Sequence, residues 1–450
     1  MLRRVTPILF ASLAVAGAAF ALLRVLPSDF TWGDHSVYFL RILEERGFGL
    51  DARAYSAWAW LGKPFLAVSP GLHGYHAYLL SLYVTQAAVL YRVLLRLGAP
   101  AALAFALVFA HVISYPLRSV GLMSSPKVLW LIAFDLLVLA FAGLIRRRTP
   151  GRLLGVLLLW AVSVLVHRLG VILTVPVFLS LALLYPRARP AAAGVLAATA
   201  GAVALLLLFL NRESSGSGLW AFFLSHFTIE WPRDIGRTVV QVGGAILASG
   251  LAGLVVLLPG HPAFRGRGAL LFLLVLSAVG TLAFAVLHPS GEKAMFVLPA
   301  LHCAVLAAGV LSAERMRWPA GRAFIVVAAA VATALVLPGA VERRGRVARM
   351  AGPWHHYARD VFGLSRGRPG IDYARAVMAA APEGVAFEGD WGVLPLLRFV
   401  LRGKGAEAAG AGVTWYVASP WNRLPTEWRG RRVVRLEECR AAGLEVGRLE

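Results

Sequence analysis

The chain reads Thr31-Trp32-Gly33-Asp34-His35-Ser36-Val37-Tyr38 directly after its first apolar run, near the start of a polar segment that extends from Pro27 to Gly74. Acids, bases and aromatic residues are interleaved in this segment, whereas most of the following sequence is apolar. An acidic residue so close behind a first membrane helix is suited to chemistry at a membrane surface. We therefore expect residues 27–74 to form an external loop around which the chain is organised.

The composition is that of a membrane protein. Of the 450 residues, 59% are hydrophobic and 15% are charged, and the mean hydropathy is +0.71, whereas soluble domains contain about 45–50% apolar and about 25% charged residues. The formal net charge is +22, but the basic residues lie mainly in short turns between apolar runs, which favours anionic lipid over nucleic acid as the partner. The two cysteines, Cys303 and Cys439, lie in dissimilar surroundings, so we expect neither a disulfide nor a cysteine metal site.

Apolar runs close to the length that crosses a bilayer, about 20 residues, recur through the first 340 residues. They cover residues 7–26, 75–95, 101–117, 128–145, 191–210, 239–258, 269–287, 296–311 and 323–337. Two shorter runs, 153–166 and 171–184, flank His167-Arg168 and are either tilted spans or the halves of a re-entrant hairpin. We predict a polytopic α-helical membrane protein with about eleven transmembrane helices, or nine if the short runs do not span.

The basic turns predict the orientation. If the spans alternate, one side of the membrane receives Arg3, Arg4, Arg92, Arg96, Arg146 to Arg148, Arg152, Arg187, Arg189, Arg265, Arg267, Arg315, Arg317 and Arg322. The positive-inside rule makes this side cytoplasmic. We therefore expect a multi-pass inner (plasma) membrane protein with a cytoplasmic N-terminus, its first apolar run being an uncleaved anchor rather than a cleaved signal peptide.

The sequence changes character after residue 340. We expect residues 1–340 to form a transmembrane domain and residues 341–450 a small soluble α/β domain, which the span count places on the extracytoplasmic side. Within it the pattern predicts helices over 372–381 and 394–401 and strands over 385–388 and 415–418.

The same alternation gathers the polar connections on the external side, where they supply candidate site residues. Asp34 could accept a proton from an acceptor hydroxyl, with His35 and Tyr38 in support, or it could be a helix cap or a solvated loop acid. Asp135 lies in the middle of a span and should face the interior of the bundle, either as a buried hydrogen-bonding group or as a contributor to a cavity.

Cations near the external helix ends could hold a phosphate. Lys293 would act as a point charge, with His288 as a donor and Glu292 beside them, or this stretch is an interfacial loop. For His167-Arg168 the alternatives are a guanidinium fork for phosphate oxygens and a snorkelling anchor. The same two alternatives apply to Arg118 and Lys127.

Several common functions lack their motifs. The sequence contains no Walker-type loop, no G-x-G-x-x-G after a strand, no H-E-x-x-H and no G-x-S-x-G. Nucleotide-driven transport, dinucleotide chemistry, zinc proteolysis and serine hydrolysis are therefore unsupported. We expect no cofactor and assign no metal ligand.

In three features the chain resembles the GT-C class of integral-membrane glycosyltransferases. They are the acid in Trp32-Gly33-Asp34-His35, the Ser124-Ser125-Pro126 that opens a span, and the stretch from His288 to Pro299. The chain departs from many relatives in having Asp34-His35 in place of an acidic pair and Lys293 in place of an arginine. The resemblance covers the order of elements over most of residues 1–340.

The resemblance implies an extracytoplasmic enzyme that moves a hexosyl or pentosyl group from a polyprenyl-phosphate donor to a hydroxyl of a glycan, lipid or protein acceptor, with inversion. Asp34 would activate the acceptor, while Lys293, His288, His167, Arg168 and Arg118 would hold the lipid phosphate. A lipid-linked glycan polymerase or ligase, and a lipid or glycan flippase, remain the alternatives, and a non-catalytic scaffold is a third.

Overall fold

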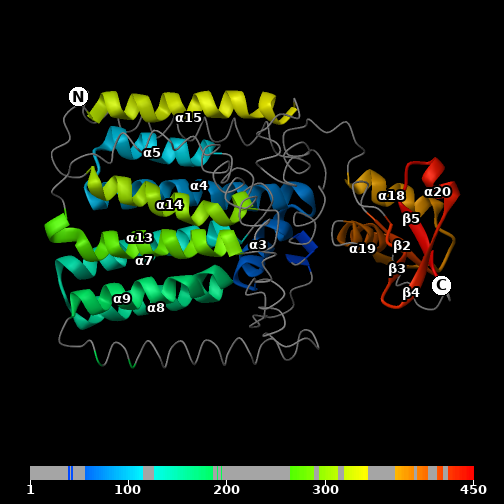
Figure 1. Ribbon diagram of the computed structural model, residues 1–450, viewed down its shortest axis with the longest axis horizontal. Helices are drawn as coiled ribbons and strands as arrows, with labels where there is room; N and C mark the ends of the chain where they lie inside the picture. Colours follow the sequence, from blue (N-terminus) through cyan, green and yellow to red (C-terminus); the bar gives the residue numbers. More distant parts are fainter. Residues whose placement is uncertain are drawn as a thin grey trace.

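A computed structural model describes two groups of elements, a helical bundle and a smaller mixed α/β region (Figure 1). The described residues are 39–40, 42–43, 56–114, 126–185, 190, 194, 264–287, 293–312, 319–342, 370–389, 393–403, 413–418 and 424–450. Of the predicted spans, 7–26 and 239–258 lie outside these residues, as does nearly all of 191–210.

The remaining apolar runs are helical at close to their predicted positions. The bundle consists of α3 (Ser56–Val68), α4 (Leu72–Leu97), α5 (Ala101–Ile113), α7 (Lys127–Arg146), α8 (Pro150–Val166), the 3-10 helix η1 (Arg168–Leu173), α9 (Thr174–Leu184), α13 (Phe264–Leu287), α14 (Lys293–Leu311) and α15 (Pro319–Glu342). Within the described residues, three helices are long and apolar enough to cross a membrane, namely those over His73–Leu97, Lys127–Arg146 and Gly268–Ala285. The total of about eleven spans stays a prediction.

The helices of the bundle lie side by side (Figure 1). Contacts join α13 to α14 and α9, α7 to α4 and α8, and α5 to α15. Gly98 ends α4 in the left-handed conformation, with φ of 97°, which glycine adopts without a steric penalty. Pro150 opens α8 at its first turn, where a missing backbone N–H costs nothing.

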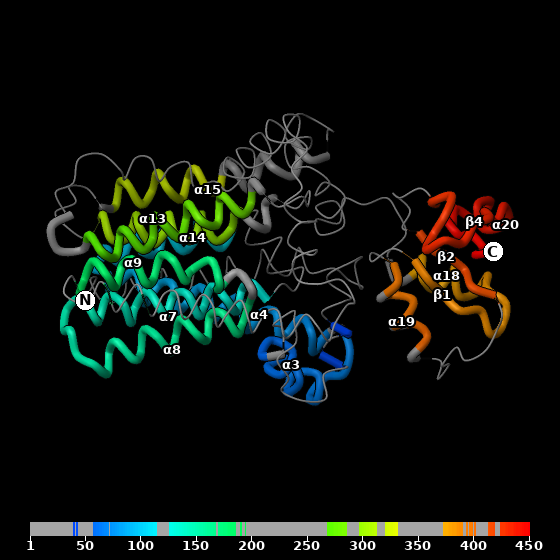
Figure 2. Tube along the Cα trace, turned by 60° about the horizontal axis from the view of Figure 1, so that its bottom comes forward, coloured from blue at the N-terminus to red at the C-terminus, as the bar shows by residue number. Residues whose placement is uncertain are grey.

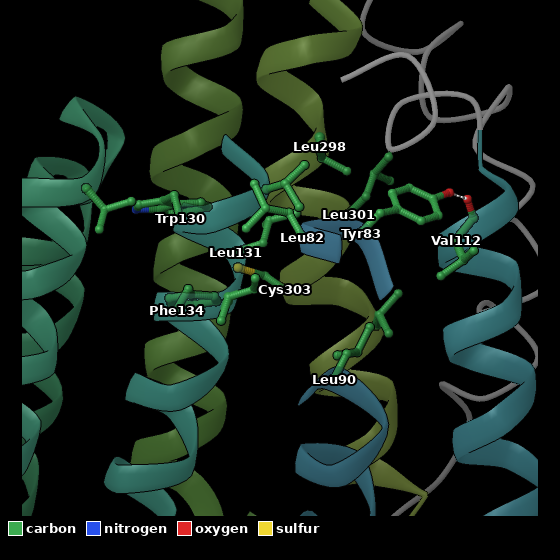
Figure 3. Packing of buried hydrophobic residues seen from close by; sticks show 14 of the residues in the cluster. Leu82, Tyr83, Leu90, Val112, Trp130, Leu131, Phe134, Leu298, Leu301 and Cys303 are labelled. Atoms are coloured by element: carbon green, nitrogen blue, oxygen red, sulfur yellow. Dashed lines mark hydrogen bonds between the residues drawn. The ribbon is translucent and has the colours of Figure 1, made fainter. Parts of the chain in front are cut away.

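Buried apolar and aromatic side chains pack the helices together (Figure 3). The rings of Trp130 and Phe134, one turn apart on α7, are stacked with centroids 5.5 Å apart. The hydroxyl of Tyr83 on α4 donates to the backbone carbonyl of Val112 on α5. In contrast, Leu158 and other residues of α8 and α9 expose large apolar side chains, as expected for surfaces that face lipid.

The polar segment 27–74, predicted as a loop, includes a helix that the sequence analysis did not identify. One side of α3 buries Trp58, Ala59 and Leu66, while Trp60 and Leu61 on the other side are 45% and 49% exposed. Both views place α3 at one end of the bundle (Figures 1 and 2). The hydroxyl of Tyr78 on α4 donates to the carbonyl of Trp58 at 2.6 Å, so α3 is fixed to the first turns of α4.

Residues 370–450 contain a five-stranded sheet with helices. Its elements are α18 (Gly370–Ala380), β1 (Ala386–Gly389), α19 (Leu394–Gly403), β2 (Thr414–Val417), β3 (Glu427–Trp428), β4 (Arg431–Arg435), α20 (Glu437–Ala441) and β5 (Val446–Leu449). The strand order is β1-β2-β5-β4-β3, with β1 parallel to β2 and the other pairs antiparallel. The two predicted helices and two predicted strands are present, whereas β3, β4, β5 and α20 were not predicted from sequence.

A single tyrosine ties the helical layer of this region to its sheet. The Tyr373 hydroxyl on α18 donates to the carbonyl of Ala418 at 2.9 Å and accepts from the backbone N–H of Glu445 at 2.8 Å. Arg429 and Gly430 connect β3 to β4 with φ of 52° and 77°, which is the pattern of a two-residue hairpin turn with positive φ at both central positions.

Candidate functional site

Two ends of the bundle can be distinguished from the direction of its helices. At one, the Nη2 of Arg146 at the end of α7 donates to the carbonyl of Arg96 near the end of α4 at 2.7 Å. We call this the arginine end, because Arg92, Arg147, Arg148, Arg152 and Arg322 also lie near the helix termini there. We call the opposite end the α3 end, since α3 contacts the beginning of α4 and the neighbouring α8.

The α3 end is where several of the predicted site residues occur. α7 begins with Lys127, α8 ends before His167 and η1 begins with Arg168. α13 returns to this end because its Gly280 lies against Ile172 of η1, so α14 begins there with Lys293. Four predicted positions from three separate stretches of sequence therefore share one end of the bundle.

The other predicted site residues lie outside the described residues. They are Asp34, His35, Tyr38, Arg118, His288 and Glu292. Their assigned roles stay predictions. Of the four that are described, Lys127 and His167 are buried, with 4% and 2% of their surface exposed.

A tight turn sets the position of Arg168. His167 leaves α8 with an extended backbone, φ −158° and ψ 138°, and the N–H of Gly170 then bonds back to the carbonyl of His167 at 2.7 Å. A Cβ on Gly170 would overlap the backbone of Ser163 and Val164. Glycine is thus required at position 170 for η1 to fold so closely over the end of α8.

Lys127 is the first residue of α7. The N-terminus of a helix carries a partial positive charge, to which Lys127 adds a full charge while almost entirely buried. Lys293 is the first residue of α14 at the same end.

A second polar group lies deeper in the bundle. The Nε2 of His302 on α14 is 2.7 Å from Oδ1 of Asp135 on α7, and its Nδ1 is 3.0 Å from Nε2 of His111 on α5. All three side chains are completely buried. Asp135 does face the interior as a hydrogen-bonded group, which confirms one of the two alternatives inferred for it.

This group crosses the bundle near mid-depth. Asp135 lies eleven residues before Arg146, His302 nine before Leu311, and His111 ten after Ala101, which corresponds to about 14–17 Å from the arginine end at about 1.5 Å per residue. A hydrocarbon core is about 30 Å thick. The three residues are far from either surface.

The sequence analysis noticed Asp135 but missed His111 and His302. A signal existed, because His111 is the one ionisable residue of the apolar helix α5, and His302 stands alone between apolar turns of α14. What the sequence could not indicate is that three helices bring these residues together. Among the described residues, no three histidine, cysteine or carboxylate side chains are placed to hold a metal ion.

Taken together, the apolar helices of the bundle indicate a polytopic membrane protein. No protein-family model matches the chain, and no curated protein matches it. The arrangement of its helices nevertheless has counterparts among solved structures.

The chain is similar to the crystal structure of ArnT from Cupriavidus metallidurans bound to undecaprenyl phosphate, with a TM-score of 0.57 and 15% sequence identity over 92% of this chain and 93% of that one. It is similar also to the apo structure of the same protein, with a TM-score of 0.52 and 16% identity over 91% and 92% of the two chains. The chain therefore has the fold of a GT-C membrane glycosyltransferase, which confirms the resemblance noted in the sequence at the level of the fold.

Proposed function

We propose that this protein is a membrane glycosyltransferase that moves a sugar from a polyprenyl-phosphate donor to an acceptor hydroxyl on the extracytoplasmic face of the membrane. The observation that carries the proposal is the shared fold, because it extends over 92% of the chain and the similar structure holds undecaprenyl phosphate. The proposed donor has the same lipid phosphate as its leaving group.

The α3 end supports the assignment of the phosphate site. Lys127 and Lys293 open two helices there, and each helix N-terminus carries a partial positive charge. Arg168, fixed by the turn at Gly170, begins a third element at the same end. Helix N-termini and cations together favour binding of phosphate.

The chemistry that we propose needs few groups. Asp34 takes the proton of the acceptor hydroxyl, whose oxygen forms a bond to the anomeric carbon as the bond from that carbon to the phosphate oxygen breaks, with inversion. The departing lipid phosphate requires stabilisation of its negative charge rather than protonation. Lys293, Lys127, Arg168, His167, His288 and Arg118 are the groups proposed to supply it, with His35, Tyr38 and Glu292 in support.

The charge distribution supports the proposed orientation. Arginines gather at the arginine end of the described helices, and inserting chains retain such turns in the cytoplasm. The α3 end would then face outward, with the helices of residues 1–340 in an inner membrane and the region 341–450 on the extracytoplasmic side.

The test is a transfer assay. The purified protein is incubated with radiolabelled polyprenyl-phosphate sugars and a membrane extract, in parallel with an Asp34→Asn variant of the same thermal stability. We expect label on an acceptor with the wild type and a rate lower by about 10²–10⁴ for the variant, the range of general-base catalysis. Movement of the donor across vesicles without transfer would indicate a flippase instead, and wild-type rates for Asp34→Asn would exclude it as the base.

A further inference from the structure

The Asp135–His302–His111 chain, defined by the three side chains joined at 2.7 and 3.0 Å, has no role in the proposed transfer. Its members come from three helices, α7, α14 and α5, and none is exposed. The ring of Phe134 lies 6.1 Å from that of His302 and the two imidazoles are 4.9 Å apart, so aromatic surface surrounds the central histidine.

The number of protons on the Asp135–His302–His111 chain follows from its hydrogen bonds. Two hydrogen bonds require two protons, one between Asp135 and His302 and one between the imidazoles. With only these two protons, Asp135 is a carboxylate and both imidazoles are neutral, so the Asp135–His302–His111 chain has a net charge of −1. A third proton makes these three side chains neutral overall.

The three-proton form can avoid charge at every member. Asp135 as a carboxylic acid then donates to Nε2 of His302, whose Nδ1–H donates to Nε2 of His111, and the last proton resides on Nδ1 of His111. This order of donors keeps both observed contacts. Because an isolated ion in the hydrocarbon region costs several kcal/mol or more, the all-neutral form is the one that the surroundings favour.

Among the described residues at this depth, the neighbouring groups supply no compensating cation. Cys303 adjoins His302, and α4 contributes uncharged Gln86 at the same depth, eleven residues before its end. The other acidic, basic and histidine residues of the packed helices lie toward the helix ends, namely Lys127, Arg146, His73, His76, Arg92, Arg96, Arg152, Arg265, Arg267, Lys293, Arg322 and Glu342.

Unused polar atoms occur at this level as well. Oδ2 of Asp135, Nδ1 of His111 and both amide atoms of Gln86 have no hydrogen-bond partner among the described residues. Buried polar atoms in proteins are normally satisfied by protein or water. A proton could therefore enter or leave the Asp135–His302–His111 chain through water bound at Asp135 or at His111.

From these observations we propose that Asp135, His302 and His111 form a proton-binding site in the membrane interior, which holds one proton beyond those of its two hydrogen bonds and so keeps Asp135 as a neutral carboxylic acid. The ligand of this site is a proton. When the extra proton is bound, α5, α7 and α14 pack around neutral side chains, and when it is absent they pack around a buried negative charge.

Infrared spectroscopy of the full-length protein in lipid tests this proposal. The pH is set well above the ordinary carboxyl pKa of about 4, where exposed acids are ionised. We expect a carboxylic-acid carbonyl band in the wild type that shifts in deuterated buffer and is missing in Asp135→Asn. The matched control is Ser180→Ala, a change at another fully buried polar residue, which should retain the band.

Each result is decisive. Absence of the band in the wild type, or its persistence in a folded Asp135→Asn protein, would overturn the proposal. Should Asp135→Asn fail to fold, Asp135→Glu replaces it, and the band must then move in frequency; an unchanged band would again overturn the assignment.

Discussion

Single residues determine the local shape of the α3 end. Lys127 and His167 are buried there, and Gly170 allows η1 to lie against the last turn of α8. Gly74 plays a similar part between α3 and α4, because a Cβ at this position would overlap the carbonyl oxygens of Ser69 and Phe65.

Replacement of Gly170 by alanine should destabilise the protein. The added methyl group would overlap the backbone of Ser163, which cannot move as a side chain can, and such overpacking costs about 1–3 kcal/mol. Thermal unfolding of the purified protein in detergent measures the effect. Gly155→Ala is the control, since nothing lies within 4 Å of its Cβ position in α8 and alanine favours helix by about 1 kcal/mol. Equal melting temperatures for the two variants would contradict the tight turn.

At the residue scale, the sequence indicated which polar residues lie inside the bundle but not which residues they contact. Asp135 could be assigned to the bundle interior because a charge in an apolar span must be paired or hydrogen-bonded. Its partner His302 is 167 residues away along the chain, and a distance in sequence of this size carries no contact information. The burial of Lys127 likewise depends on how α7 packs, so from the sequence it was either a phosphate-binding cation or a snorkelling anchor.

At the scale of elements, helix direction determines which residues meet. α7 and α14 both start at the α3 end, so each presents a lysine at its N-terminus. Sequence periodicity located these helices to within a few residues, because apolar runs bounded by charged turns mark membrane helices. It missed α3, whose one-sided burial of Trp58 and Leu66 is interrupted by polar and small residues.

Removal of the charge at the start of α14 should weaken donor binding. We expect Lys293→Gln to lower kcat/KM for the polyprenyl-phosphate sugar by about 10- to 100-fold, because a hydrogen bond to a charged group contributes about 1.5–3 kcal/mol. The control is Arg147→Gln at the arginine end, an exposed position, which should leave the rate unchanged. Equal effects of both changes would point to general electrostatics rather than to a site.

The link between α18 and the sheet makes a separate prediction. Tyr373→Phe should destabilise the C-terminal region by about 1–3 kcal/mol, because the Ala418 carbonyl and the Glu445 N–H each lose a buried partner. Hydrogen exchange over residues 413–418 and 444–450 should quicken. Arg375→Gln, which removes an exposed ion pair with Asp372, is the control and should have little effect. Unchanged exchange in Tyr373→Phe would mean that the hydroxyl does not hold the layers together.

At the scale of the whole molecule, the arginines of helices α4, α7 and α8 gather at one end of the bundle. The short strands β3 to β5 escaped sequence analysis because strands of two to five residues, rich in arginine, lack a clear alternation. The larger division into apolar helices and a polar C-terminal region could be predicted because composition alone separates a chain that fits hydrocarbon from one that fits water.

Labelling of single cysteines in intact cells tests the orientation. In a background with Cys303→Ser and Cys439→Ser, we expect a membrane-impermeant maleimide to label Glu437→Cys but to label Arg147→Cys only after permeabilisation. Native Cys439 itself is a poor reporter, since burial, and secondarily the nearby Glu438, raises the pKa of its thiol. The reverse labelling pattern would show that the arginine end faces outward.

The fastening of α3 to α4 has a consequence for how the protein sits in its bilayer. Trp60 and Leu61 point away from the bundle, and the Lys63 ammonium lies 5.3 Å from the centre of the Trp60 ring. Tryptophan and lysine side chains in such pairs lie at the level of lipid headgroups. Because α3 is bonded to α4, its level determines how deeply this end of the bundle lies in the membrane.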